Sequence, residues 1–301
     1  MNMHQENSLQ QKLSAILDKA DQLLNALSIP ANDWSAIAYH WKKRHVFGTE
    51  FGYLQPIHAI HQVCLNDLKN IDDQKQQIIQ NTRQFISGQP ANNVLLTGAR
   101  GTGKSSLIKG ILTQFSSDGL RLIEVNKDHL ADLADIAQAI HGRPEYFIIF
   151  CDDLSFENAD PGYKALKVAL DGSLESGSQN MLIYATSNRR HLIPEYFEEN
   201  RQYTYQEDEI HPADTVEEKI SLSERFGLWL SFYPFNQDEY WEIASTWLLY
   251  LGLDKTALVD AKQDALRWAL QRGSRSGRVA WQFAKNYVGM VNQDEKKEKN
   301  N

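Results

Sequence analysis

Eight residues near the end of the first third of the chain constrain its fold more than any other feature. Residues 98–105 read Gly-Ala-Arg-Gly-Thr-Gly-Lys-Ser and fit the pattern G-x-x-x-x-G-K-S/T. The apolar run at residues 94–97 is typical of a short buried strand, and residues 105–115 carry apolar side chains at helical spacing. The sequence therefore predicts a phosphate-binding loop at a strand-to-helix turn.

Each residue type in this loop has a physical task. Gly98, Gly101 and Gly103 let the backbone turn its N–H groups inwards, and these groups form a cradle for anions together with the helix N-terminus. Lys104 reaches the β- and γ-phosphates in such loops, and the hydroxyl of Ser105 binds Mg²⁺. A chance glycine-rich turn is the alternative, but here strand, loop and helix stand in register. The predicted nucleotide-binding residues of the loop are Gly98, Ala99, Arg100, Gly101, Thr102, Gly103, Lys104, Ser105 and Ser106.

Five segments with strand character alternate with helical patterns along the middle of the chain. Residues 146–151, 181–185 and 228–232 are continuous apolar runs, which are typical of strands buried on both faces. Residues 120–125 alternate between apolar and polar side chains sufficiently to form a strand. The fifth segment is the apolar run at residues 94–97, before the phosphate loop. Strands that alternate with helices predict an α/β fold with a five-stranded parallel sheet and right-handed crossovers.

The N-terminal region reads as helical. Apolar residues between Leu9 and Leu27 recur at spacings of four and three, as in an amphipathic helix that ends near Pro30. Asp33 then reads as the N-cap of a second helix. One face of this helix would consist of Trp34, Ile37, Ala38 and Trp41, and its last turn of Lys42, Lys43 and Arg44. Residues 45–65 carry two glycines and a proline, and they read as an irregular linker.

The chain after residue 235 reads as helical too. Residues 236–239 form a helix start that resembles a capping box, and helical patterns follow at residues 239–251, 258–271 and 277–288. The chain therefore divides into four predicted parts. They are an N-terminal helical segment and linker at residues 1–66, an α/β nucleotide-binding core at 67–235, a helical lid at 236–290 and a disordered charged tail at 291–301.

Composition sets limits on the partners of this chain. Its 301 residues carry a formal net charge of −8, which disfavours nucleic acid as a partner but leaves room for a local basic groove. No run of about eighteen apolar residues occurs, so no membrane-spanning helix is expected. Cys64 and Cys151 are too few for a disulfide framework, and a reduced cytoplasm is the expected setting.

Polar residues follow two of the apolar runs. Asp152 and Asp153 come directly after residues 146–151, and a strand that ends in an acid is the second half of a P-loop nucleotide site. Asp152 is expected to hold Mg²⁺, mostly through water, and Asp153 to act as the general base for the attacking water. Asn188 follows residues 181–185 closely and is placed to orient that water. A solvated turn is the alternative at both strand ends.

The order of these motifs resembles that of an AAA+ ATPase. The shared order is a phosphate loop, an acidic strand end, a Thr-Ser-Asn strand end, an arginine before the last strand, and a helical lid. Five segments are also similar to a bacterial AAA+ family of unknown function, and the similarity extends from about residue 34 to about residue 287. These segments are residues 90–96, 98–106, 150–156, 184–192 and 223–227.

The resemblance implies further roles by position. Asn188 takes the sensor-1 place, and Arg225 takes the place of an arginine finger that reaches the ATP of a neighbouring subunit. Arg278 fits the sensor-2 place best, with Arg275 as the competitor. Ile71 falls where such proteins bring an apolar residue beside the adenine, although the residue before it is asparagine where they have glycine.

The acidic strand end departs from the AAA+ pattern, because this chain has Asp-Asp where Asp-Glu is usual. Asp153 is one methylene shorter than glutamate, so either Asp153 or the nearby Glu157 would serve as the base. The resemblance implies an enzyme that hydrolyses ATP with Mg²⁺ as cofactor. It also implies slow hydrolysis at a site that is completed only when copies of the chain assemble into a homo-oligomer.

The partner on which such an ATPase acts is left open. The first hypothesis is remodelling of an unidentified protein partner, driven or switched by ATP and ADP. The alternative is an ATP-dependent loader or adaptor in DNA replication or transposition. The basic clusters at residues 42–44 and 189–191 are the only ones expected to reach a phosphate backbone. A protein unfoldase is disfavoured, because residues 126–130 lack the aromatic side chain of a gripping loop.

Overall fold

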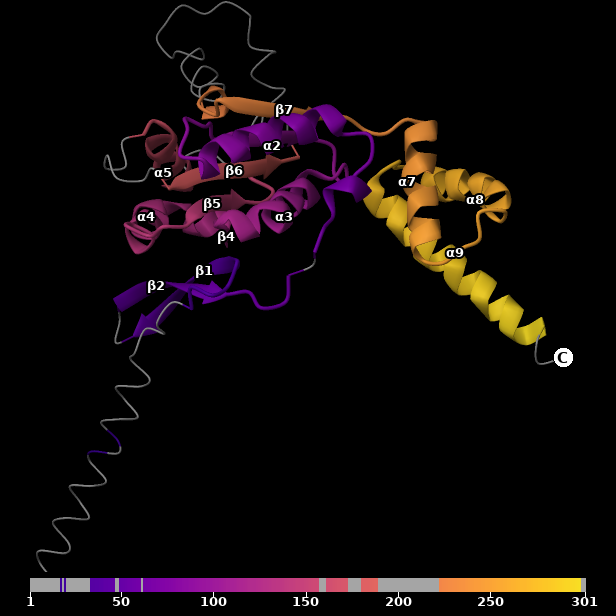
Figure 1. The fold of residues 1–301 in the computed structure, drawn as a ribbon, viewed down its shortest axis with the longest axis horizontal. Helices are drawn as coiled ribbons and strands as arrows, with labels where there is room; N and C mark the ends of the chain where they lie inside the picture. Colours follow the sequence, from indigo (N-terminus) through magenta and orange to yellow (C-terminus); the bar gives the residue numbers. More distant parts are fainter. Residues whose placement is uncertain are drawn as a thin grey trace, which may run out of the picture.

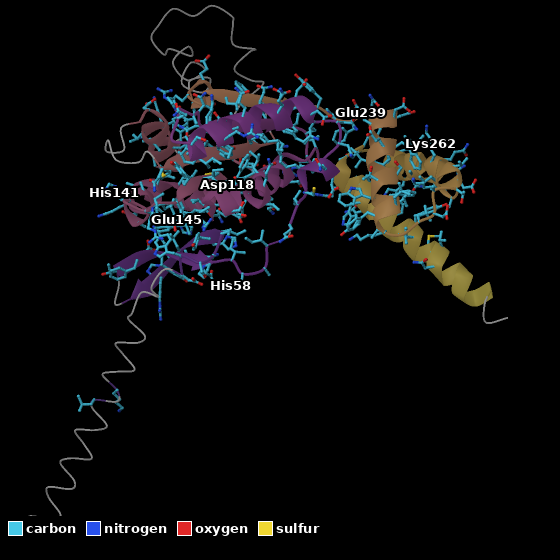
Figure 2. The ribbon with its side chains drawn as sticks, viewed as in Figure 1. His58, Asp118, His141, Glu145, Glu239 and Lys262 are labelled. Atoms are coloured by element: carbon cyan, nitrogen blue, oxygen red, sulfur yellow. The ribbon has the colours of Figure 1, made fainter. Side chains whose placement is uncertain are left out.

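The computed structural model of the chain describes residues 17, 19, 33–46, 49–60, 62–156, 161–172, 180–188 and 222–298. These residues form a sheet with helices on both faces and a group of helices at one end (Figure 1). Figure 2 marks the two regions by labelled side chains. Asp118, His141 and Glu145 lie on the sheet-containing core, and Glu239 and Lys262 lie on the helical group.

A seven-stranded sheet forms the centre of the core. Its strand order is β2-β1-β4-β5-β6-β3-β7. Five neighbouring strands, β4, β5, β6, β3 and β7, are parallel to one another, which confirms the predicted parallel sheet. β1 extends it parallel to β4, and β2 is antiparallel to β1. The strands are β1 (Ala38–Val46), β2 (Thr49–Pro56), β3 (Val94–Gly98), β4 (Leu120–Glu124), β5 (Tyr146–Cys151), β6 (Met181–Ser187) and β7 (Leu228–Phe232).

Helices cover both faces of the sheet, which explains why the central strands are apolar throughout. Ile148 of β5 faces the layer of α2 and α3, and Ile149 faces the layer of α4 and α5. The core helices are α2 (Asp72–Ile86), α3 (Lys104–Phe115), α4 (Leu133–Ala139) and α5 (Pro161–Leu170), with short 3₁₀ turns η1 (Leu65–Asp67), η2 (Ser116–Asp118) and η3 (Lys127–Asp132).

The predicted lid is built from α7 (Gln237–Tyr250), α8 (Leu258–Gln271) and α9 (Gly277–Glu298). The predicted capping box is confirmed, since the Asn236 side chain accepts from the N–H of Glu239 and the Glu239 side chain accepts from the N–H of Asn236. The prediction of a disordered tail from residue 291 is wrong as far as Glu298. Residues 291–298 are rich in good helix formers, and α9 continues through them.

The second predicted N-terminal helix is wrong, because these residues form strand β1. Tyr39 and Trp41 are buried and Lys42 is exposed, so alternation with a period of two decides the structure over helical spacing. The predicted irregular linker is also wrong where β2 pairs with β1. Gly52 of β2 leaves room for the Trp41 ring, since a Cβ at Gly52 would lie 2.0 Å from Trp41 Cζ2.

Several predictions fall outside the described part of the chain. They concern most of the helix at residues 9–27, of which only Leu17 and Lys19 are described as helical, the candidate base Glu157, and the basic cluster at residues 189–191. Within the described residues, no helix combines the length and the apolar character that crossing a membrane requires.

Candidate nucleotide-binding site

The phosphate loop joins the end of β3 to the start of α3 through backbone angles that favour glycine. Gly98, Gly101 and Gly103 have φ angles of +133°, +76° and +101°. A Cβ at Gly98 would lie 1.9 Å from the carbonyl oxygen of Phe232, and one at Gly101 would lie 2.9 Å from the side chain of Ser276. Neighbouring segments therefore leave space at these positions for backbone alone.

Lys104 is the first residue of α3, and its amine is held inside the loop. Its Nζ donates to the carbonyl oxygens of Gly98 at 2.7 Å and Ala99 at 2.8 Å, and to Asn188 Oδ1 at 3.1 Å. These contacts use all three ammonium protons. Burial lowers the pKa of Lys104, and the two carboxylates that follow β5 oppose this shift. The loop therefore surrounds a desolvated cation.

The strand order brings the two predicted magnesium ligands together. β6 lies between β5 and β3, so the carboxyl ends of these three strands meet beside the loop. Ser105 Oγ donates to Asp152 Oδ1 at 2.6 Å, and the hydroxyl of Thr186 donates to the same oxygen. Hydroxyl and carboxylate oxygens are hard ligands of the kind that Mg²⁺ prefers. The side chains of Ser105 and Asp152 therefore fit a magnesium ion.

Thr186 is a positioning residue that the sequence alone does not distinguish. Its hydroxyl accepts from the N–H of Asp153 at 2.9 Å while it donates to Asp152, and its carbonyl accepts from the N–H of Leu154 at 2.7 Å. The side chain is buried. Thr186, at the end of β6, thus fixes the carboxylate of Asp152 and the backbone of Asp153 and Leu154, which follow β5. The pairing of Cys151 with Ala185 would have pointed to Thr186, but strand register is not readable from one sequence.

Replacing Thr186 by valine should impair both the use of magnesium and the stability of the fold. Valine keeps the shape of the side chain but removes the hydroxyl. Asp152 then keeps Ser105 as a donor but loses Thr186, and the N–H of Asp153 loses its acceptor, at a cost of about 1–3 kcal/mol in unfolding free energy. We expect the Mg²⁺ concentration for half-maximal nucleotide binding to rise about tenfold. Thr186→Ser keeps the hydroxyl and should behave like the wild type. Equal Mg²⁺ requirements in both variants would contradict the positioning role.

Asp153 is held by two side chains on the solvent side of the site. Its φ angle is +54°, in the left-handed region that aspartate tolerates better than most residues. Asn188 Nδ2 donates to its carboxylate, and Arg100 lies 3.7 Å from it. Because the other end of the Asn188 amide contacts Lys104, Asn188 connects the phosphate loop with the predicted general base.

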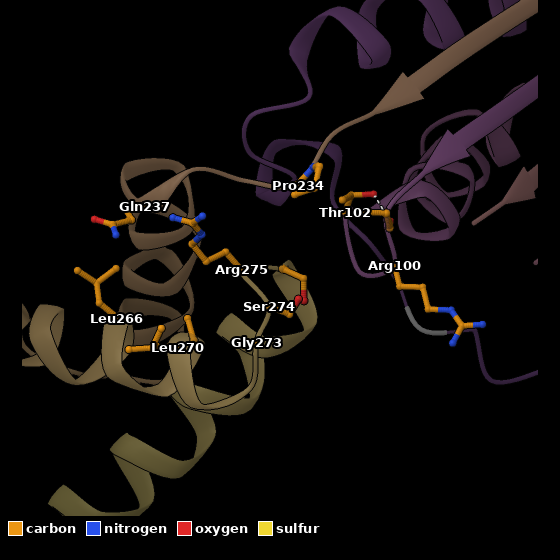
Figure 3. A pocket seen from close by; sticks show the side chains of 12 residues that line it. Arg100, Thr102, Pro234, Gln237, Leu266, Leu270, Gly273, Ser274 and Arg275 are labelled. Atoms are coloured by element: carbon orange, nitrogen blue, oxygen red, sulfur yellow. Dashed lines mark hydrogen bonds between the residues drawn. The ribbon is translucent and has the colours of Figure 1, made fainter. Parts of the chain in front are cut away.

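A cavity of about 580 Å³ lies between the loop and the lid (Figure 3). Its lid side includes the apolar side chains of Leu266 and Leu270 from α8, and Leu270 is 82% exposed. In Figure 3 the side chain of Arg100 points away from the lid, consistent with its contact with Asp153. The residues that line the cavity are Ala99, Arg100, Thr102, Pro234, Gln237, Leu266, Ala269, Leu270, Gly273, Ser274, Arg275 and Ser276.

The start of α9 contacts the phosphate loop directly. The N–H of Gly277 donates to the carbonyl of Gly101 at 2.8 Å. Arg275 lines the cavity, whereas the Cβ of Arg278 lies 3.4 Å from the place of a Cβ on Gly101. Both arginines are exposed, and both lie at or just before the start of α9, where the lid contacts the loop. The choice between them as sensor 2 therefore stays a prediction.

Ile71 lies next to the phosphate loop. It precedes α2, is buried, and its Cδ1 lies 3.6 Å from the place of a Cβ on Gly103. Asn70 has a φ of +61°, a conformation that glycine and asparagine share, which explains how asparagine can stand where the AAA+ proteins that the sequence resembles have glycine. Asn70 Nδ2 also donates to the carbonyl of Glu239 in the lid.

Arg225 lies far from the phosphate loop of its own chain. It precedes β7, whose residues Leu228 and Phe232 pair with Val94 and Gly98 of the parallel strand β3. Arg225 is therefore at the amino edge of the sheet, and the loop is at the carboxyl edge, a strand length of roughly 16 Å away. Its Nε donates to Asp171 at 2.6 Å, at the end of α5. The structure does not bring Arg225 into the site of the same chain.

Comparison with known proteins assigns the chain to a family. The family model described as "Protein of unknown function (DUF815)" matches residues 35–291. The chain belongs to this family. No curated protein matches the sequence.

Solved structures identify the fold. Two RuvB variants from Thermotoga maritima align with TM-scores of 0.53 and 0.52, at 15% and 14% identity. Each alignment covers 78% of this chain and 67% of the RuvB chain. At such low identity the likeness concerns the fold alone, which is that of an AAA+ core. The family match confirms the predicted similarity to a family of unknown function, and the alignments confirm the predicted AAA+ fold.

Proposed function

We propose that this protein is an ATP hydrolase of the AAA+ type that drives or switches the remodelling of a partner. The observation that carries the proposal is the convergence of three strand ends on one point. Lys104, the Ser105–Asp152 pair and Asn188 meet there, beside a loop that leaves space for backbone alone at Gly98 and Gly101. A site that binds a nucleoside triphosphate together with Mg²⁺ requires this combination of groups.

The residues present fit ATP and magnesium. Backbone N–H groups of residues 98–106 and the ammonium of Lys104 would hold the phosphates, and Ser105 and Asp152 would hold Mg²⁺. The cavity beside Leu266 and Leu270 offers apolar surface for a base, and Ile71 adds an apolar side chain next to Gly103 of the loop. Bound Mg²⁺ would supply neutralisation of phosphate charge. One arginine of the lid, Arg278 or Arg275, would add a cation from the lid side.

Hydrolysis needs a base and a group that orients water. Asp153 would take the proton of the attacking water, with Glu157 as the competing base, and Asn188 would orient that water. The contact between Asn188 and Asp153 supports this assignment, because it keeps the carboxylate beside the loop. Since Arg225 is remote from its own site, we assign it to the site of a neighbouring copy, which makes the active unit a homo-oligomer.

Turnover as a function of protein concentration tests this function. We expect ATP hydrolysis per chain to rise with concentration, because each site needs Arg225 of a neighbour. Light scattering after size-exclusion chromatography should show larger species with a non-hydrolysable ATP analogue than with ADP. A monomer that binds no ATP would contradict the proposal as a whole. A monomer that hydrolyses ATP at a constant rate per chain would contradict the shared site only.

A further inference from the structure

The β1–β2 hairpin is fixed to the core through its inner face. Trp41 Nε1 donates to Asp132 Oδ2 at 3.0 Å, and Lys43 Nζ lies 2.8 Å from Asp132 Oδ1. Lys43 also contacts Glu50 of β2 at 3.2 Å. The buried Leu54 stands opposite Trp41 on the same face. These contacts attach β1 and β2 to the core and determine the direction of their outer face.

The outer face carries two cations opposite two aromatic rings. In the antiparallel register, Lys42 pairs with Tyr53 and Arg44 pairs with Phe51, so all four side chains point to the same side. Lys42 and Arg44 are exposed, Phe51 is 39% exposed, and Tyr53 is half-buried. We call these four residues the hairpin patch.

Acidic groups near the hairpin patch are already paired. Glu50 contacts Lys43 and His45 on the inner face, and Glu124 at the end of β4 contacts His40 at 3.5 Å. Within the described residues, neither lysine nor arginine of the patch makes an ion pair. The patch therefore presents positive charge on a chain whose net charge is negative.

The position of the patch relates it to the nucleotide site. β1 pairs with β4 only as far as His40 and Glu124, the last residue of β4, and then continues beyond it. Lys42 and Arg44 thus extend past the carboxyl edge of the sheet, the edge at which the phosphate loop also lies. Figure 1 shows the hairpin below the rest of the sheet, and β7 lies at the opposite side.

We infer that the hairpin patch binds single-stranded nucleic acid. Phe51 and Tyr53 are two residues apart on one strand, roughly 7 Å, so each ring can stack on a separate base. Lys42 and Arg44 stand beside the rings and would contact the phosphates between those bases. A duplex keeps its bases stacked inside and offers no free base for the rings. An acidic peptide would satisfy the cations but would leave the aromatic rings without a defined role.

Binding of a labelled oligonucleotide by the full-length protein tests this inference. Fluorescence anisotropy with a thirty-nucleotide thymidine strand is measured in EDTA without ATP, so the result is independent of the proposed ATPase. A thirty-nucleotide uridine strand distinguishes RNA from DNA. We expect the logarithm of the association constant to fall linearly with the logarithm of the salt concentration. The slope should be about −1.4, which corresponds to two phosphate contacts on a single strand. Combined Phe51→Ala and Tyr53→Ala should weaken binding about tenfold or more.

Charge reversal at the patch has a matched control on the lid. Lys42→Glu with Arg44→Glu should abolish binding, whereas Lys262→Glu with Arg267→Glu makes the same change of charge on α8 and should leave binding intact. Tyr250→Ala, which removes an exposed aromatic ring from α7, is the control for the ring variants. Circular dichroism melting establishes that each variant is folded.

Four results would overturn the inference. The first is failure of the wild type to bind either strand at low salt, and the second is an equal loss of oligonucleotide affinity in the patch variants and the lid variants. The third is tighter binding of a duplex than of the single strand. The fourth is binding of a polyglutamate peptide in place of the oligonucleotides. The last of these would identify the patch as a docking site for an acidic protein segment.

Discussion

Replacing Lys104 by alanine is expected to weaken ATP binding at least about 100-fold, roughly 3 kcal/mol, and to abolish hydrolysis. The ammonium is the only cation that the loop encloses among the described residues, and it is desolvated there. A charge in such a place interacts strongly with phosphate because little water screens it. Alanine leaves the backbone N–H groups in place but removes this attraction.

The same substitution should change folding stability little. Burial already lowers the pKa of Lys104, which means that the charged amine is held at a cost in the free protein. Removing it relieves that cost, and water can replace the amine at the carbonyl oxygens of Gly98 and Ala99. We therefore expect the unfolding free energy to change by about 1 kcal/mol or less. Loss of binding would then report on the site and not on the fold.

Titration with a fluorescent ATP analogue measures this effect. Lys109→Ala is the matched control, because Lys109 is an exposed lysine on the same helix and should leave the affinity unchanged. Equal affinity of Lys104→Ala and Lys109→Ala would show that the loop is not a phosphate site. The affinity of the hairpin patch for an oligonucleotide, measured without ATP, should be the same in both variants.

The core of the fold was predictable because its signals are local. Residues 146–151 are apolar without interruption, and a short segment of this kind between turn residues has few structures other than a strand buried on both faces. The phosphate loop is equally local, since its glycines and Lys104 lie within seven positions. Gly98, Gly101 and Gly103 adopt the positive φ angles that glycine favours, and no partner from elsewhere in the chain is needed to recognise the loop.

The N-terminal hairpin was not predictable in the same way. Trp34, Ile37, Ala38 and Trp41 satisfy a helical spacing, and the alternation of Tyr39 and Trp41 with His40 and Lys42 satisfies a strand. What decides between them is tertiary, because β4 offers an edge for pairing, Asp132 anchors Trp41 and Gly52 makes room for its ring. The nearest of these partners in sequence is Gly52, which is 11 residues from Trp41, so a short sequence window around Trp41 contains no sign of these contacts.

Parts of the site have the same long-range origin. The link from Lys104 through Asn188 to Asp153 joins three strand ends that are far apart in sequence. Asp152 and Asn188 were predictable as single residues, because an acid or amide after a buried strand has few other uses beside a phosphate loop. The contribution of Thr186 depends on the register of β5 and β6, and this is fixed by packing on both faces of the sheet.

Replacing Arg225 by alanine should leave ATP binding intact and reduce hydrolysis about 10³-fold or more. In the isolated chain Arg225 lies at the amino edge of the sheet, so it has no way to act on its own loop. Its effect on hydrolysis would then come only from contact with the site of a neighbouring copy. An arginine supplied in this way stabilises negative charge that develops during hydrolysis, and it contributes little to binding of the ground state.

The ion pair with Asp171 provides the control that separates this role from a structural one. Asp171→Asn breaks the same ion pair but keeps the arginine. Both side chains are partly exposed, so the pair itself should contribute about 0.2–1 kcal/mol to stability. If Arg225 acted only through its ion pair with Asp171, the two substitutions would have equally small effects on turnover. We expect Asp171→Asn to retain hydrolysis, and Arg225→Ala to lose it at every protein concentration.

Mixing two inactive variants completes the argument. Lys104→Ala lacks a working phosphate loop but carries Arg225, whereas Arg225→Ala carries an intact loop. If the arginine acts between copies, mixed assemblies contain sites with an intact loop from one copy and an arginine from the other, and ATP hydrolysis should reappear on mixing. Activity that stays absent in demonstrably mixed oligomers, or normal hydrolysis by Arg225→Ala alone, would remove Arg225 from the active site and leave it as the partner of Asp171.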